Sequence, residues 1–136
     1  METNQLTVVN PPEFGRPSGF AHGVLAPNGG RMLFVGGQIA SVGGGRVQTD
    51  DFLEQFDLAL ANVVTVVRAA GGRAEQIARM TIYVTTMKLY HERRPALREV
   101  WQRHLGSHYP AVALVQVLGL VDERAMIEIE ATAVVP

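Results

Sequence analysis

Apolar and polar residues recur with two different periods along this chain, and these periods predict the order of its secondary structure. Two long stretches, 50–72 and 88–105, place apolar residues three or four positions apart, which is typical of a helix with one buried stripe. In the first helix we expect that stripe to run from Phe52 to Val67. Shorter apolar or alternating runs are rich in Val, Ile and Thr, as strands are. The predicted strands span 5–9, 20–26, 31–40, 77–85, 110–120 and 125–135.

Glycine, proline and asparagine mark the ends of these elements. Residues 27–30 (PNGG) are typical of a hairpin turn between the second and third strands, because Asn and Gly accept positive φ. Gly71 follows the first helix, as C-terminal glycines do. Pro95 is expected to start or to kink the second helix. Gly36 and Gly37 interrupt the third strand, where the missing side chains let another backbone or a ligand approach closely.

The order β-β-β-α-β-α-β-β predicts an α+β fold, with a single mixed β-sheet and two helices packed on one face. Right-handed crossovers place both helices on the same side of the sheet. Each helix has only one apolar stripe to bury, which fits a two-layer arrangement. The length of 136 residues suits one domain over residues 1–136.

Both predicted helices cover one face of the sheet, so neither of them covers the second face. It carries Thr81, Tyr83, Glu128 and Glu130 among apolar residues. A solvated face would be more uniformly polar, and a buried core face would not hold two carboxylates without partners. The mixture predicts a face covered by another subunit, with polar groups lining a cleft between subunits. A half-polar face open to solvent is the alternative, since single exposed apolar residues are normal.

Composition limits the classes of function that remain. The formal net charge is −1, so no basic excess favours a nucleic-acid partner. The chain has no cysteine, which excludes disulfides and thiolate metal sites. No stretch approaches the roughly 20 apolar residues of a membrane span, and residues 1–14 lack the basic and apolar regions of a signal peptide. We therefore expect a cytoplasmic protein without a membrane or nucleic-acid partner.

Five segments resemble, in matching order, the reactive intermediate deaminase family, also called the RidA or YjgF family. They are RPSGFAHGV (16–24), FVGGQIA (34–40), QFDLALANVVTVVRAAGG with the following ARMTIYVTTM, YPAVALVQV, and IEIEATAVV. The resemblance spans residues 16–135. It implies a chorismate-mutase-like fold and a homotrimer whose three sheets pack inward as a barrel, with clefts between subunits. It also implies hydrolysis of reactive enamines and imines without a cofactor.

Matching the family's positions one by one places several residues at the implied cleft. Glu128 matches the glutamate that positions the attacking water, and Phe20 matches a lining tyrosine without its hydroxyl. Gly36-Gly37 match a Ser-Gly pair without its hydroxyl. Val112 stands where the deaminases carry an arginine that clamps the substrate carboxylate through two parallel hydrogen bonds, so a small 2-imino acid is not the expected substrate. The expected catalytic residue is Glu128, and the expected substrate-binding residues are Phe20, Gly37, Gln38, Arg98, Val112, Ala113 and Leu114.

For several candidate residues the sequence allows two interpretations of their role. Arg98 matches an asparagine on the family's second helix, and it either replaces the missing clamp or lies on a solvated surface beside Arg94. His22 is either an acid or base near the cleft or a strand histidine with a satisfied hydrogen bond. Glu130 matches no catalytic position, so a structural role is expected. No metal site is expected, because a zinc spacing and a paired carboxylate are both lacking at His91, His104 and His108.

Two hypotheses of function follow. The first is a cofactor-independent hydrolase or deaminase that acts on an imine, enamine or related C–N bond between subunits, with Glu128 orienting water. The alternative is a non-catalytic trimer of the same fold that binds a small metabolite or a partner protein in that cleft. A third activity, ribonuclease, is attached to some family members, and the lack of a basic stripe gives it little support. The expected partners are a small-molecule ligand and further copies of this chain in a homotrimer.

Overall fold

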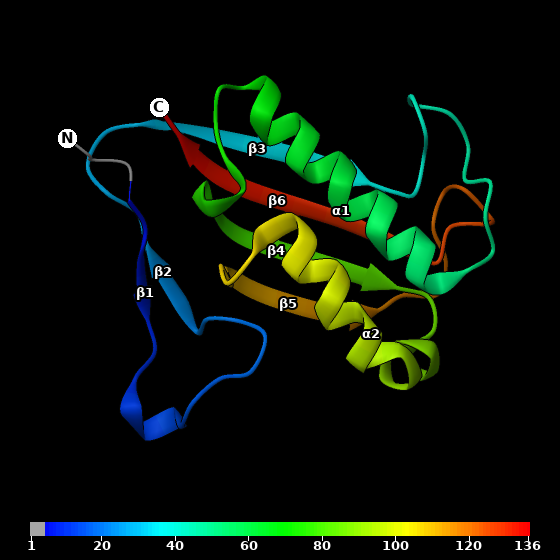
Figure 1. Cartoon of the computed structure of the whole chain (residues 1–136), viewed down its shortest axis with the longest axis horizontal. Helices are drawn as coiled ribbons and strands as arrows, with labels where there is room; N and C mark the ends of the chain where they lie inside the picture. Colours follow the sequence, from blue (N-terminus) through cyan, green and yellow to red (C-terminus); the bar gives the residue numbers. More distant parts are fainter. Residues whose placement is uncertain (1–4) are drawn as a thin grey trace.

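The strands and helices follow the predicted order (Figure 1) in the computed structural model, which describes residues 5–136. Residues 1–4, part of the stretch that lacks a signal-peptide pattern, lie outside the described residues. The two helices are α1 (Phe52–Ala69) and α2 (Met87–Leu105), and short 3-10 turns cover Pro12–Phe14 and Ala74–Gln76. The strands are β1 (Thr7–Val9), β2 (Gly23–Leu25), β3 (Arg31–Gln38), β4 (Ile77–Val84), β5 (Ala111–Gln116) and β6 (Ile127–Val135).

Four strands form the main sheet, in the order β3-β6-β4-β5. β6 runs antiparallel to both of its neighbours, whereas β4 and β5 run parallel, so the sheet is mixed. Both helices lie on the same face of this sheet (Figure 1). The predicted α+β arrangement of two helices on one face of a mixed sheet is therefore confirmed.

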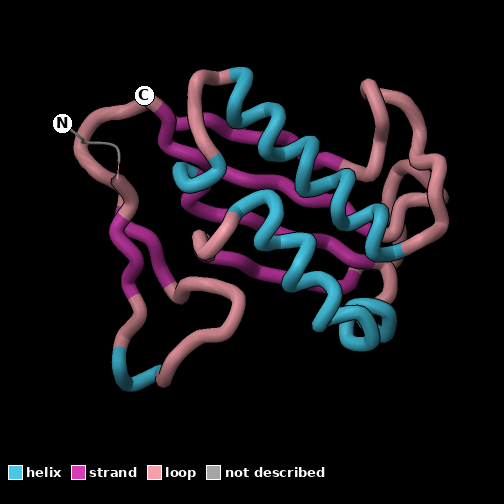
Figure 2. Tube along the Cα trace, viewed as in Figure 1, coloured by secondary structure: helices cyan, strands magenta, loops and turns pink. Residues whose placement is uncertain are grey.

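The first two strands form a small sheet of their own, which corrects the prediction of one continuous sheet. β1 pairs antiparallel with β2, and the pair projects away from the main sheet (Figure 2). The sequence predicted a hairpin turn at residues 27–30, and the two-residue form of such a turn has positive φ at Asn28 and Gly29. Positive φ instead falls on Gly29 (89°) and Gly30 (81°), and no described residue other than glycine has it. Without that turn, β2 is directed away from β3 and pairs with β1 alone.

The helices begin and end where their capping residues predict. The Asp51 carboxylate accepts a hydrogen bond from the Glu54 amide at 2.9 Å, which satisfies one free donor at the start of α1. Thr86 does the same for Leu89 at the start of α2. Pro95 lies inside α2, and the helix changes direction along its first half (Figure 2). A proline at this place removes one intrahelical hydrogen bond, which explains a kink rather than a start.

The core lies between the helices and the sheet, on the positions that the hydrophobic periods predict. The stripes of both helices are buried, from Phe52 to Val67 in α1 and from Leu97 to Leu105 in α2. They pack on a continuous apolar sheet face, whose buried members are Met80, Ile82, Val84, Ile127, Ile129, Ala131 and Ala133. None of the helices in residues 5–136 is long and apolar enough to cross a membrane.

The opposite face of the sheet has no covering layer within this chain. Met32 and Phe34 on β3 are 63% and 72% exposed, and Val115 on β5 is also exposed. Their strand partners on this face include Thr132 and Tyr83, so large apolar groups stand among polar ones. Met32 and Phe34 lie close together on β3, whereas Val115 is on the opposite edge strand. Neighbouring exposed apolar groups such as the β3 pair are typical of an interaction surface.

Candidate functional site

A cavity of about 1010 Å³ lies between α2, the edge of β5 and the segment 16–21. The Ala21 amide donates a hydrogen bond to the Pro110 carbonyl at 2.9 Å, and Ala21 forms a parallel bridge with Ala111. This pairing fixes the segment along the start of β5. Four residues expected at the site line the cavity, namely Phe20, Arg98, Val112 and Leu114.

The cavity wall contains polar and aromatic residues that the sequence interpretation left out. Tyr90, Arg94, Arg98 and Gln102 line it from α2 at steps of four residues. Residues four apart share one helix face, so this spacing was a signal in the sequence beside the apolar stripe of the same helix. Arg98 is exposed and also borders the cavity, so its side chain lies where either of its two interpretations would place it. Arg16, Trp101 and Tyr109 complete this part of the wall.

A second group of expected site residues lies on the uncovered face of the sheet. Glu128 is half-buried on β6 and approaches Gly37 on β3 so closely that a Cβ at Gly37 would collide with its carboxylate. Gly37 has no positive φ, so the position of the Glu128 carboxylate, and not backbone conformation, favours glycine here. The Gln38 amide donates to the Gly36 carbonyl at 3.2 Å. Ala113 is exposed on this side of β5 and does not line the cavity with Val112 and Leu114, because side chains alternate along a strand.

The two carboxylates of β6 have different surroundings. Glu130 accepts a hydrogen bond from the Tyr83 hydroxyl at 2.7 Å, which gives it the structural role expected of it. Within residues 5–136, the Glu128 carboxylate has no hydrogen-bond partner. A carboxylate that is confined beside Gly37 and still free to accept a hydrogen bond can hold a water molecule.

The Tyr83–Glu130 contact predicts a measurable titration. The hydrogen bond to Glu130 raises the pKa of the Tyr83 phenol, and desolvation and the charges of Glu130 and Glu128 add to this, while Arg79 opposes it. The folded state therefore holds the phenol proton more tightly than the unfolded chain. The stabilisation is complete below the ordinary tyrosine pKa of about 10, and it is lost as the pH rises through the higher folded value.

We expect Glu130→Gln to lower the pKa of Tyr83. Absorbance at 295 nm, measured as the difference between each protein and its Tyr83→Phe counterpart, isolates this phenol from the other tyrosines. An unchanged midpoint in Glu130→Gln would show that this carboxylate does not hold the phenol proton.

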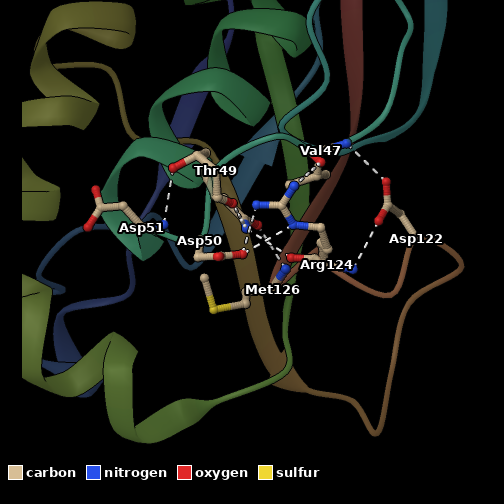
Figure 3. A network of polar contacts seen from close by, with 8 residues as sticks. Val47, Thr49, Asp50, Asp51, Asp122, Arg124 and Met126 are labelled. Carbon is tan, nitrogen blue, oxygen red and sulfur yellow. Dashed lines mark hydrogen bonds and ion pairs between the residues drawn. The ribbon is translucent and has the colours of Figure 1, made fainter.

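A network of polar contacts joins the two loops that precede α1 and β6 (Figure 3). The Asp122 carboxylate accepts hydrogen bonds from the backbone amides of Val47 and Arg124, at 3.0 and 2.9 Å. These two donors lower the pKa of Asp122 from its ordinary value. The Arg124 guanidinium donates to Asp50, with its nearer nitrogen at 3.0 Å, and to the Val47 carbonyl at 3.3 Å. The loops are thereby held together at the end of the sheet where β6 begins.

Gln55 on α1 completes this connection from inside the protein. Its fully buried amide donates to the carbonyls of Thr49 and Arg124, at 2.8 and 3.0 Å, and accepts from the Met126 amide at 2.8 Å. Met126 precedes Glu128 by two residues. Gln55 therefore fixes the start of β6 and, through it, the position of the Glu128 side chain.

The histidines have structural partners. His104 lies 2.6 Å from the Asp57 carboxylate on α1, which corrects the expectation that it has no paired carboxylate. The two residues are 47 positions apart, so only the packing of α1 on α2 brings them together. His108 contacts the Ile77 carbonyl at 2.7 Å, and His22 is exposed between the rings of Phe14 and Phe20. Within residues 5–136, no three acidic or histidine side chains form a group suited to a metal ion.

The expected site residues thus form two groups on opposite faces of one protomer. Phe20, Arg98, Val112 and Leu114 line the cavity on the helix side, whereas Glu128 and Gly37 lie on the uncovered side. Within a single protomer, Glu128 does not reach the cavity that the other residues line.

Comparisons with known proteins agree with this fold and with the family resemblance of the sequence. The family model described as endoribonuclease L-PSP matches residues 17–135. The chain is 32% identical over 108 residues to TdcF of Escherichia coli K12, a protein named as a reactive intermediate deaminase, and the match covers 77% of this chain and 80% of TdcF.

Solved structures show the same arrangement of elements. The Rid-family protein YyfB of Yersinia pestis is 31% identical and has a TM-score of 0.84, with 96% of this chain and 99% of YyfB covered. TdcF of E. coli with bound serine has a TM-score of 0.66 at 31% identity, with 90% and 92% covered. The YjgF protein of E. coli has a TM-score of 0.67 at 28% identity, with 98% of each chain covered.

Proposed function

We propose, from the premise that this chain belongs to the RidA/YjgF family, that it is a homotrimeric hydrolase that acts on the C–N bond of imines or enamines. The two groups of site residues would meet between subunits, with Glu128 and Gly37 from one protomer facing Phe20, Val112 and Leu114 of the next. No cofactor is required by this chemistry. The relative TdcF has been crystallised with serine, which supports a small-molecule ligand for this chain as well.

The observation that carries this proposal is the placement of the two groups on opposite faces of the sheet. Closed rings form when one surface of a subunit binds a different surface of the next subunit. In such a ring, the uncovered sheet face would turn inward and bury Met32 and Phe34 against neighbouring copies. The same closure would bring each Glu128 towards the β5 edge of an adjacent protomer.

The proposed reaction needs only water and a correctly placed carboxylate. Glu128 would accept a hydrogen bond from a water molecule and orient it towards the imine carbon, as a general base does. The water oxygen forms a bond to that carbon, and its proton passes through the carboxylate to the nitrogen. The remaining proton on that oxygen then moves to the nitrogen as the C–N bond breaks, which releases ammonia or an amine and leaves a carbonyl compound.

The identity of residue 112 bears on the choice of substrate. Val112 offers no hydrogen bond to an α-carboxylate, whereas an arginine would offer two. Val112 and Leu114 together make this part of the wall apolar. The proposed substrate is therefore larger or less polar than 2-aminoacrylate, and full activity on 2-aminoacrylate would contradict this selectivity.

Binding without turnover is the second candidate. It is favoured by the residues at positions 20, 36 and 112, which lack the polar groups that the family's deaminases carry there. In this case the trimer would hold a ligand in the same cleft, and replacement of Glu128 would leave ligand affinity unchanged.

A mixing experiment tests whether the site is shared between subunits. Glu128→Gln would disable one half of each site, and Val112→Trp would block the other half by filling the cavity. Each variant alone is expected to be inactive. Mixed at equal amounts, unfolded and refolded together, they should regain about one quarter of the wild-type activity, because mixed trimers carry one site with both halves intact.

The assay uses two imines generated in situ, with semicarbazide as the competing trap. One lacks an α-carboxylate and is formed from 2-phenylethylamine by an amine oxidase, and the other carries it and is formed from phenylalanine by an amino-acid oxidase. Sedimentation equilibrium gives the oligomeric state of each sample, and Leu114→Trp replaces Val112→Trp if that variant fails to fold. A mixture that stays inactive while it forms trimers would overturn the shared site. Wild-type protein that accelerates hydrolysis of neither imine would overturn the proposed activity.

A further inference from the structure

Three arginines line the cavity beside α2, and the described residues that line it include no aspartate or glutamate. Arg94 and Arg98 come from the helix, and Arg16 comes from the segment that Ala21 fixes along β5. Arg94 and Arg98 also border an adjoining pocket of about 610 Å³, together with Ser18. Arg94 and Arg98 therefore border both hollows, and Arg16 borders the larger one.

The other cations of the same helix have carboxylate partners. Lys88 pairs with Glu92 at 3.6 Å, Arg93 with Asp51 at 4.0 Å, and Arg103 with Asp57 at 3.7 Å. Among residues 5–136, no ion pair joins Arg16, Arg94 or Arg98 to a carboxylate. Of the lysine and arginine residues on α2, Arg94 and Arg98 are thus the two without such an ion pair among residues 5–136, and both border the cavity.

The position of Arg94 and Arg98 four residues apart is unfavourable unless an anion is present. Like charges at this spacing destabilise a helix slightly. A bound anion between the two guanidinium groups would replace this repulsion with attraction. Guanidinium groups match the geometry of carboxylate and phosphate oxygens, to which each can donate two parallel hydrogen bonds.

The remainder of the wall suits an apolar or aromatic group. The Trp101 and Tyr109 rings stack with their centroids 5.7 Å apart and their planes within 3° of parallel, and both line the cavity. Phe20, Val112 and Leu114 lie along the same wall. A ligand with a charged end and an apolar body would contact both parts at once.

We propose that this cavity binds an organic anion, with its phosphate or carboxylate group on Arg94, Arg98 and Arg16 and its apolar body against the β5 side of the wall. If the proposed function holds, this anion is the substrate, and its negative charge lies several bonds away from the reacting carbon. In this chain, arginines on α2 would then bind the negative charge, whereas the family's deaminases bind it with an arginine at the position of Val112 on β5. The inference depends on the proposed function only for the role of the ligand as substrate.

Trp101 provides a direct measurement, because it is the only tryptophan of the chain and lines the cavity. Phenyl phosphate serves as the probe, with phenol as its uncharged counterpart and inorganic phosphate as the anion alone. We expect phenyl phosphate to change Trp101 fluorescence in a saturable manner and to bind more tightly than either control compound. Added sodium chloride should weaken this binding by screening the charges.

Two variants separate the cavity arginines from the charge of the helix. The double variant Arg94→Gln/Arg98→Gln is expected to raise the dissociation constant for phenyl phosphate about ten- to a hundredfold, as loss of charged hydrogen bonds does. Arg103→Gln removes one positive charge from the same helix outside the cavity and should leave the constant within about twofold. Circular dichroism confirms that these exposed substitutions leave the fold intact.

Three results would overturn this inference: no saturable change in the wild type, equal affinity for phenol, or unchanged affinity in the double variant. Affinity for inorganic phosphate equal to that for phenyl phosphate would overturn the role of the apolar wall. The measurement does not involve Glu128, so it is independent of hydrolysis. Binding without turnover would contradict the proposed function alone, whereas hydrolysis that is insensitive to the double variant would contradict this inference alone.

Discussion

Replacing Glu128 by glutamine is expected to lower imine hydrolysis by about 10²–10⁴-fold, the range that a positioned general base contributes. Glutamine keeps the length and shape of the side chain, so it still fits beside Gly37. It can accept a hydrogen bond from water but cannot take a proton from it. The loss should appear in kcat, with little change in KM, because the carboxylate acts on water rather than on the substrate body.

Glu130→Gln is the matched control for this variant. Glu130 lies on the same strand and the same face, two residues further on, but its carboxylate is engaged with the Tyr83 hydroxyl. We expect hydrolysis within a fewfold of the wild type. Equal losses in the two variants would indicate a general effect of charge on this face, and full activity in Glu128→Gln would remove Glu128 from the reaction.

The substitution Gln55→Leu is expected to lower the free energy of unfolding by about 3 kcal/mol, the largest effect on stability that we predict. Leucine has nearly the same volume but offers no hydrogen bond. The Met126 amide and the carbonyls of Thr49 and Arg124 would lose their partner at a site that is fully buried. Each buried polar group left without a partner costs about 1–3 kcal/mol, and partial access of water reduces the sum.

Urea unfolding followed by circular dichroism measures this change as a lower midpoint with a similar slope. Gln48→Leu is the control, since Gln48 is exposed and close in sequence, and its effect should stay within about 0.5 kcal/mol. A loss below about 1 kcal/mol for Gln55→Leu would show that the two loops hold β6 in place without it. The same variant should also reduce hydrolysis, because Gln55 positions the strand that carries Glu128.

Local patterns were sufficient to predict the two layers of this fold. The stripes of α1 and α2 and the apolar side of β4 and β6 are set by residues close together in the sequence, and each has one face to bury. The turn at residues 27–30 was predicted wrongly, because Asn28 and Gly29 had the residue types of a hairpin. Positive φ falls on Gly29 and Gly30 instead, and β2 pairs with β1, a contact between separate segments that the turn sequence does not encode.

The candidate site was harder to predict than the fold. The closeness of Gly37 and Glu128 follows from the register of β3 with β6, and the glycine pair gave a partial indication of it. Arg16 lines the cavity from a loop. A loop has no hydrophobic periodicity, so the sequence contains no signal for the position of Arg16. The contact of Asp57 with His104 depends on the angle at which α1 and α2 pack, and this angle could not be predicted from the sequence.

The lack of room beside Gly37 also constrains how this protein can evolve. A change to alanine there would push the Glu128 carboxylate out of its present position, because the end of this flexible side chain occupies the space that a Cβ would need. The two positions should therefore covary among relatives, and a lineage that gains a side chain at 37 is expected to have abandoned this hydrolytic chemistry. The pair of residues thus provides an evolutionary marker that separates catalytic descendants from those that only bind.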